Sequence, residues 1–185
     1  MPSWDETQAP WRFILGDTIL ALDDFQRLLV ELLPRLRRLA RALTRHEADA
    51  DDLAQLAVER ALERRAQWRP GTRLDSWMFT IMRHAWIDET RARGRRGRVM
   101  AGPDAAEFVA DPGIASLETR READAVRRAM ADLPEDQRLA VALVLVEGLS
   151  YSEAAQVMEV PMGTLTSRLS RGRATLMATI SGEAA

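Results

Sequence analysis

The segment 150–173 contains residues that favour the start and the end of two helices joined by a tight turn. Few folds are compatible with all of these signals at this spacing. Ser150 and Glu153 have the spacing of a capping box, in which each side chain satisfies the backbone N–H of the other residue. Alanines in the first helix leave room for a second helix to cross closely. Pro161 favours the start of that second helix, which is expected from 162 to about 177. The segment therefore predicts a helix-turn-helix.

The second helix of this motif has one apolar side and one polar, cationic side without an acid. Leu165, Leu169 and Leu176 are expected to face inward. A solvated helix face usually carries both signs of charge, and the Ser and Thr residues here reduce helix propensity. A polar, cationic helix on a tight turn suits the DNA major groove. The candidate DNA-binding residues are Thr164, Thr166, Ser167, Arg168, Ser170, Arg171 and Arg173.

Composition alone does not indicate a nucleic-acid partner, because the 185-residue chain has a net charge of −2. The local distribution of charge does: residues 1–31 hold six acids against two arginines, whereas 91–98 hold five arginines and no acid. The chain has no cysteine, so neither disulfides nor thiolate metal sites are expected. No apolar run approaches the length of a membrane span, and no signal peptide is apparent. We therefore expect no membrane insertion and a cytoplasmic protein.

Helical periodicity dominates the chain from Leu22 to Ile180. Apolar residues recur at three- and four-residue spacing between Phe25 and Leu43, although Pro34 is expected to kink this helix or to split it in two. Two more helices are expected over 49–68 and from 74 to about 93. No segment alternates polar and apolar residues over any length, so strands are not expected.

The second half of the chain begins after turn residues without periodicity at 99–115. Ser116 is expected to cap a helix to Ala131, and Pro134 to open another that ends at Gly148. The sequence thus predicts an all-α protein of two small helical domains joined by a flexible linker. The expected parts are an acidic N-terminal extension at 1–22, a helical domain at 23–98, the linker at 99–115 and a second helical domain at 116–180, with the helix-turn-helix at about 150–173.

Acidic residues recur along the helix expected at 49–68. Asp52, Gln55 and Glu59, continued by Glu63, would form an outward polar ridge. A solvated helix face accounts for this ridge about as well as a functional role does. A metal site is a weaker interpretation, because adjacent acids lack a histidine at ligand spacing. We predict no metal and no cofactor.

Aromatic and basic residues alternate on the next helix. Phe79, Arg83 and Trp86 are expected to lie off its core face, with His84 beside them. Such a stripe either stacks unpaired bases, at about 1–3 kcal/mol per base, or covers a neighbouring helix. The arginine run that follows favours contact with phosphate over a disordered tail.

These residues resemble region 2 and region 4 of the extracytoplasmic-function (group 4) sigma factors of the sigma-70 family. The first half carries Asp49-x-x-Asp52-Leu53-x-Gln55, then Gly71-x-x-Leu74-x-x-Trp77-Met78-Phe79-x-Ile81-x-Arg83-x-Ala85-x-Ile87-Asp88 and the arginine run. The second half carries Leu133-Pro134-x-x-x-Arg138, Gly148-Leu149-Ser150-Tyr151-x-Glu153-x-Ala155 and Pro161-x-Gly163-Thr164-Leu165-x-Ser167-Arg168-Leu169-x-Arg171-x-Arg173. The resemblance spans residues 23–180 in order.

The resemblance implies a sigma factor that binds core RNA polymerase and promoter DNA, is held by an anti-sigma factor and catalyses no reaction. It assigns polymerase binding to Asp49, Asp52, Gln55 and Glu59. It assigns the −10 element to Phe79, Arg83, His84, Trp86, Arg91, Arg93, Arg95 and Arg96, and the −35 element to the helix that begins at Met162. His84 stands where the family commonly has Asn, and Thr166 where it has Lys or Arg.

Two other classes of protein compete with this interpretation. A stand-alone helix-turn-helix repressor or activator would bind duplex DNA without polymerase, but no dimerisation seam is visible. A carboxylate-dependent hydrolase built on Asp49 and Asp52 would lack a nucleophile–base pair and a phosphate-binding loop.

Overall fold

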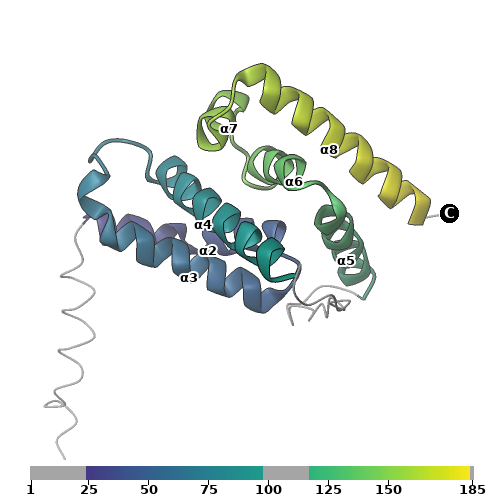
Figure 1. Cartoon of the computed structure of the whole chain (residues 1–185), viewed down its shortest axis with the longest axis horizontal. Helices are drawn as coiled ribbons and strands as arrows, with labels where there is room; N and C mark the ends of the chain where they lie inside the picture. Colours follow the sequence, from purple (N-terminus) through teal and green to yellow (C-terminus); the bar gives the residue numbers. More distant parts are fainter. Residues whose placement is uncertain (1–23, 98–116, 184–185) are drawn as a thin grey trace, which may run out of the picture. The chain divides into compact units, whose positions relative to one another are not determined.

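The computed structural model describes residues 24–97 and 117–183, and every regular element in these ranges is helical (Figure 1). The expected all-α class is therefore confirmed. The elements are α2 (Asp24–Leu43), α3 (Glu47–Glu63), a short 3₁₀ helix (Arg65–Gln67), α4 (Leu74–Gly97), α5 (Leu117–Asp132), α6 (Glu135–Val141), a π-helical turn (Ala142–Val146), α7 (Tyr151–Met158) and α8 (Met162–Glu183).

The chain divides into two compact units, Met1–Leu32 and Leu33–Ala185, and the division falls within α2. The described part of the first unit is the start of α2, where Phe25, Leu29 and Leu32 are buried. The second unit holds all the other described helices. The extension expected at 1–22 and the linker expected at 99–115 lie outside the described residues. The division into two functional domains stays a prediction.

Helix α2 passes through Pro34 without interruption, so of the two expected effects the split does not occur, and the kink stays a prediction. A proline inside a helix costs about 3 kcal/mol, because a backbone hydrogen bond is lost and the ring meets the preceding turn. Leu36, Leu39 and Leu43 are completely buried in the second unit. Each contributes roughly 1.5–3 kcal/mol by leaving water. The free energy gained by burying these leucines thus exceeds the cost of the proline in the helix.

Helices α3 and α4 pack along each other, and α7 packs on α4 as well. On one face of α4, Leu74, Met78, Ile81, Met82 and Ala85 are all at most 7% exposed, whereas Trp77 on the same helix is partly buried. From α3, the small side chains Ala54, Ala57 and Ala61 are buried. Small residues let two helix backbones approach closely.

In the second half of the chain, α8 packs against α5, α6 and α7. The helix expected to run from Pro134 to Gly148 changes at Ala142 into a π-helical turn that ends at Val146. Gly148 closes this segment with φ 70°, a conformation that glycine adopts without the steric cost of a Cβ. The widened turn places Glu147 so that it points back into the protein, where its side chain is fully buried.

Gly172 of α8 lies close to α6 where the two helices cross. A Cβ on this residue would lie 2.8 Å from Cγ2 of Val141 and 3.3 Å from the carbonyl oxygen of Gln137. Only glycine therefore permits the crossing as it stands.

Replacing Gly172 by valine is expected to lower the free energy of unfolding by about 2–3 kcal/mol, because overpacking forces the two helices apart. Gly163→Val, on the same helix, is the matched control, since a Cβ at Gly163 meets no atom within 4 Å. The measurement is urea denaturation of the full chain followed by circular dichroism. Equal losses in the two variants would show that the crossing tolerates a larger side chain.

Candidate nucleic-acid and polymerase interface

The start of α7 has the predicted capping box. The Oγ of Ser150 accepts a hydrogen bond from the backbone N–H of Glu153 at 3.3 Å. In return, the Glu153 carboxylate accepts one from the backbone N–H of Ser150 at 2.8 Å. This reciprocal cap fixes where α7 begins.

The turn between α7 and α8 contains a residue in the left-handed region. Glu159 caps α7 with φ 53°, and the following Val160 donates its N–H to the carbonyl of Ala155 at 3.1 Å. Pro161 precedes α8, which begins at Met162. Leu165, Leu169 and Leu176 are buried as expected. The fold and this turn define the class of helix-turn-helix proteins.

The candidate DNA-binding residues of α8 differ in exposure. Thr166, Ser170, Arg171 and Arg173 are exposed, whereas Thr164, Ser167 and Arg168 are partly buried. Arg171 donates to the Oγ of Ser167 at 3.2 Å, so the two side chains are held on one face. Arg168 instead forms an ion pair with Asp136 of α6 at 2.9 Å. The guanidinium of Arg168 is thereby partly committed to a contact within the protein.

Three of the four candidate polymerase-binding residues lie together. Asp52, Gln55 and Glu59 are exposed along α3, and the amide of Gln55 donates to the Glu59 carboxylate at 2.8 Å. Asp49 is partly buried and pairs with Arg93 of α4 at 2.6 Å. This hydrogen bond raises the pKa of Arg93. Asp49, assigned to polymerase, and Arg93, assigned to the −10 element, therefore form an ion pair with each other.

The aromatic residues of α4 do not form an exposed stripe, and this expectation is wrong. Phe79 is 0% exposed and Trp86 is 5% exposed. The reason is that α4 packs against both α3 and α7, so more than one face of this helix is buried. The guanidinium of Arg35 lies 5.1 Å from the centre of the Phe79 ring, within the range of a cation–π interaction. A base could stack on these rings only after a helix packed against α4 had moved away.

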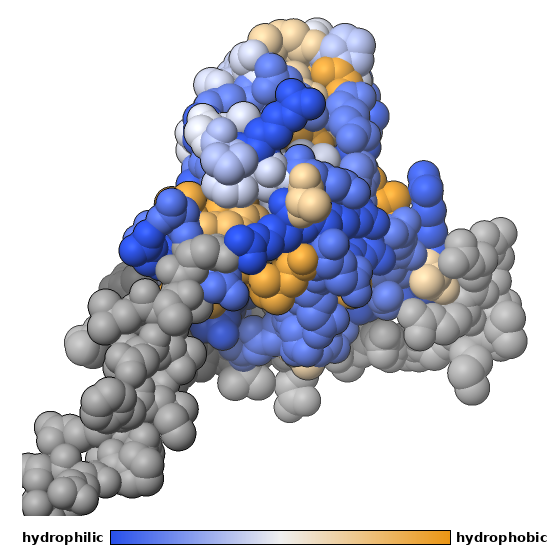
Figure 2. Space-filling model, turned by 90° about the vertical axis from the view of Figure 1, so that its left-hand side faces the viewer, coloured by the Kyte–Doolittle hydropathy of each residue, from blue (hydrophilic) through white to orange (hydrophobic). Residues whose placement is uncertain are grey.

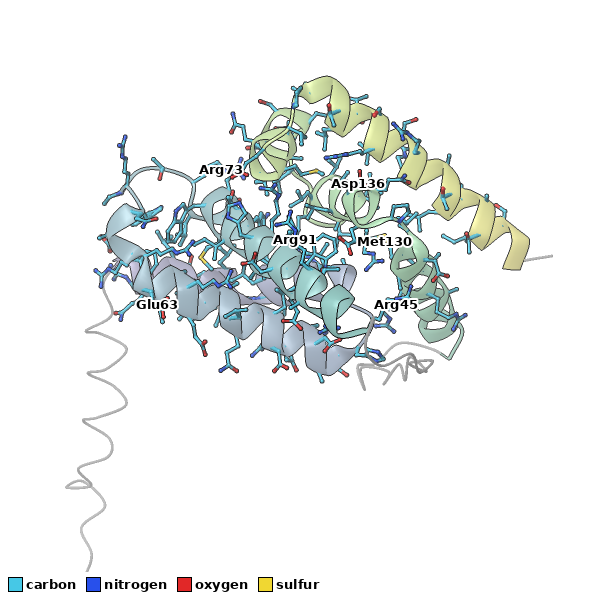
Figure 3. All side chains as sticks on the ribbon, in the orientation of Figure 1. Arg45, Glu63, Arg73, Arg91, Met130 and Asp136 are labelled. Carbon is cyan, nitrogen blue, oxygen red and sulfur yellow. The ribbon has the colours of Figure 1, made fainter. Side chains whose placement is uncertain are left out.

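The polar members of the same candidate set lie at the surface of α4. Arg83 pairs with Glu159 of the helix-turn-helix turn at 2.7 Å, and His84 lies 3.2 Å from the same carboxylate. Arg91 is exposed on α4 (Figure 3). Arg95 and Arg96 fall within the bounds of α4, but their side chains lie outside the described residues.

Besides the ion pair between Arg83 and Glu159, a second ion pair connects α7 to the residue that precedes α4. Arg73, just before α4, forms an ion pair with Glu153 of α7 and another with Asp75 at 2.7 Å (Figure 3). Burial raises the pKa of Asp75, but hydrogen bonds from Arg73 and Arg35 and from the Ser76 N–H outweigh it and lower the pKa to about 2. Asp75 is therefore an anion at any pH at which the protein functions.

A buried acid that connects distant segments was not predicted from the sequence. The Glu147 carboxylate accepts hydrogen bonds from the Nε of Arg35 at 3.1 Å and from the Nε and Nη2 of Arg38 at 2.8 and 3.1 Å. Arg35 also donates to the backbone carbonyl of Glu147 at 3.3 Å and to Asp75 at 2.9 Å. One signal was available: Glu147 is an acid at the end of the apolar run that begins at Leu139.

Arg138 is the second residue whose structural role was missed. It is 9% exposed and donates to the backbone carbonyls of Leu43, Ala131 and Leu133 at 2.8, 2.5 and 2.9 Å. Burial lowers the pKa of this guanidinium, with a further contribution from Arg45. The three carbonyls lie at or near the C-terminal ends of α2 and α5, where the helix dipole favours a cation.

Within residues 24–97 and 117–183, no group of three His, Cys, Asp or Glu side chains is arranged to hold a metal ion. No helix in these ranges is long and apolar enough to cross a membrane. Figure 2 shows a face that is mostly hydrophilic, with apolar side chains visible only in small patches.

Comparisons with known proteins identify both halves of the chain. The family model "Sigma-70, region 4" matches residues 123–176, and "Sigma2 domain of PhyR" matches residues 29–83. The chain is 35% identical over 150 residues to the ECF RNA polymerase sigma factor EcfG of Rhodopseudomonas palustris, with 81% of each chain covered. It is 37% identical over 142 residues to the ECF RNA polymerase sigma factor SigM of Mycobacterium tuberculosis, covering 77% of this chain and 69% of SigM.

A solved structure agrees with these sequence matches. The sigma factor RpoE, crystallised in complex with the anti-sigma factor NepR from Bartonella quintana, matches with a TM-score of 0.74 and 30% sequence identity. The match covers 86% of this chain and 98% of RpoE. The chain belongs to the family of extracytoplasmic-function RNA polymerase sigma factors.

Proposed function

We propose that this sigma factor binds core RNA polymerase through the ridge on α3 and directs initiation at promoters with defined −10 and −35 elements. Region 2 corresponds to residues 23–98 and region 4 to 116–180. The protein catalyses no reaction itself and acts in the cytoplasm, where it positions the polymerase and aids promoter melting. The observation that carries this proposal is the exposed polar face of α8 on a capped helix-turn-helix.

The proposed −35 contact divides the residues of α8 into two groups. Ser167, Ser170 and Arg171 are assigned to base edges, and Arg171 is held beside Ser167 by their hydrogen bond. Arg173 is exposed further along the helix and is assigned to phosphate. Arg168 joins the DNA contacts only if the DNA replaces Asp136 as its partner.

We propose that an anti-sigma factor holds the protein inactive. The similar RpoE structure is a complex with an anti-sigma factor, which supports this form of regulation. The acidic extension at 1–22 is a second candidate contact for such a partner.

The test is run-off transcription by core polymerase with and without this protein. A transcript that depends on the added protein is expected, and its absence on every promoter of a genomic template library would contradict the proposal. A stand-alone regulator would instead bind duplex DNA equally well without polymerase.

Arg171→Ala is expected to flatten the preference between matched and altered −35 sequences, because an Arg–guanine pair contributes about 1–3 kcal/mol of discrimination. Arg173→Ala should weaken binding to both sequences alike and reduce the salt slope by about one unit. The measurement is the affinity of the holoenzyme for both promoters across a salt series. If the two variants exchanged these behaviours, the assigned register of α8 would be wrong.

A further inference from the structure

An open pocket of about 360 Å³ lies where the end of α3, the middle of α4 and the turn of the helix-turn-helix meet. Its walls are mainly cationic. The residues that matter for its chemistry are Arg60, Arg64, Arg83, His84, Arg91 and Glu159.

The carboxylate of Glu159 enters this pocket from the α7–α8 turn. It accepts a hydrogen bond from Nη1 of Arg83 at 2.7 Å, and one of its oxygens lies 3.2 Å from Nε2 of His84. The hydrogen bond from Arg83 lowers the pKa of Glu159, and a weaker one from His84 acts in the same direction. Glu159 also has a left-handed backbone, which is uncommon for a residue other than glycine. The turn thus presents an anion to the pocket.

Two carboxylates line the pocket, Glu159 and Asp88, and they do not balance its four arginines. Arg60 pairs with Asp88 at 3.1 Å. Arg64 and Arg91 are exposed and form no ion pair with any residue in the described ranges. Arginine binds phosphate oxygens with two parallel hydrogen bonds and remains charged at every physiological pH. Guanidinium groups around an open cavity are therefore suited to an anion larger than one carboxylate.

We propose that this pocket is a phosphate-binding site for single-stranded DNA, which Glu159 occupies as an intramolecular substitute while α7 packs on α4. The inference rests on the proposed function, and it extends the DNA-binding surface from α4 to Arg60 of α3 and to Arg64, the residue that caps α3. Two ion pairs hold α7 on α4, Arg73 with Glu153 near the start of α7 and Arg83 with Glu159 at its end. A DNA phosphate at Arg83 displaces the second of these pairs. Strand binding and the release of the helix-turn-helix from α4 are therefore coupled.

The competition is tested with the full chain and a fluorescein-labelled single-stranded dT12, measured by fluorescence anisotropy. Glu159→Gln keeps the shape of the side chain and removes its charge, and it is expected to raise the affinity for dT12 about five- to tenfold. Asp51→Asn is the matched control, since it removes one charge from an exposed position of α3 outside this pocket. Affinities that rise equally in the two variants would overturn the competition.

Arg64, one of the two arginines that the proposal adds to the DNA-binding surface, is tested separately. In the Glu159→Gln background, Arg64→Ala is expected to lower the affinity for dT12 about fivefold and to reduce the salt slope by about 0.7, the value for one phosphate of a single strand. Arg37→Ala, an exposed arginine of α2 outside the pocket, is the control and is expected to change neither quantity. Identical behaviour of Arg64→Ala and Arg37→Ala would overturn the phosphate site.

Run-off transcription separates failure of this inference from failure of the proposed function. If the unaltered chain supports transcription while the Glu159 and Arg64 variants behave like their controls on dT12, the pocket is not a phosphate site and the sigma-factor function stands. If the chain supports no transcription, the proposed function itself fails, whatever the result with dT12.

Discussion

Replacing Glu147 by alanine is expected to lower the free energy of unfolding by about 3–5 kcal/mol, one of the two largest effects in this protein. The substitution leaves the guanidinium groups of Arg35 and Arg38 without the carboxylate that accepts three of their hydrogen bonds. The carboxylate is completely buried, whereas the arginines are 31% and 51% exposed. Water can therefore solvate part of the charge that remains, and the lower end of the range is the closer expectation.

The experiment is chemical denaturation of the full chain, followed by circular dichroism. Glu147→Gln keeps the shape of the side chain but loses its charge and one of its two acceptor oxygens, so it should be about half as damaging. Asp51→Ala, an exposed acid of α3, controls for the loss of one negative charge. An alanine variant as stable as this control would mean that the network of Glu147 contributes no net stability.

Arg138→Met is expected to have a similarly large effect and to lower the free energy of unfolding by about 3–4 kcal/mol. Methionine preserves much of the apolar volume, but the carbonyls of Leu43, Ala131 and Leu133 lose their donor. Each unsatisfied buried acceptor costs about 1–3 kcal/mol. The total loss of stability is expected to be smaller than the sum of three such penalties, because water reaches some of the freed carbonyls.

Arg138→Lys distinguishes the geometry of this group from its charge. A lysine keeps the positive charge, but its single ammonium cannot reproduce the span of the guanidinium fork, so we expect less than half of the loss to be recovered. The same denaturation experiment measures it. Full recovery by lysine would show that a cation alone, rather than the fork geometry, satisfies the helix ends.

Local sequence signals predicted the local structure well. The capping box of Ser150 and Glu153 and the inward leucines of α8 are both confirmed. Such features depend on residues three or four positions apart, and helix geometry fixes their relation. The prediction for α4 was wrong for Phe79 and Trp86 because a helical period identifies one buried face. It does not show that a second helix, α7, covers another face.

The contacts that connect distant residues could not be predicted from pattern. Arg35 and Glu147 are separated by 112 positions, and Arg83 and Glu159 by 76. Ordinary charged residues on a helix surface give the same sequence signal whether they face solvent or a partner. The sequence therefore identified Arg83 as a DNA-binding candidate but not the carboxylate with which it pairs.

The hydrogen bonds of Arg138 also have a consequence for the order in which parts of the protein fold. The carbonyl of Leu43 receives its donor from a residue 95 positions later in the chain. During synthesis, α2, α3 and α4 have left the ribosome before Arg138 exists, and domains generally form from the N-terminus onward. We therefore expect the end of α2 to be hydrated while the first helices assemble. We also expect the docking of Arg138 to be a late folding event, because closure of a long loop must precede the stabilising contact.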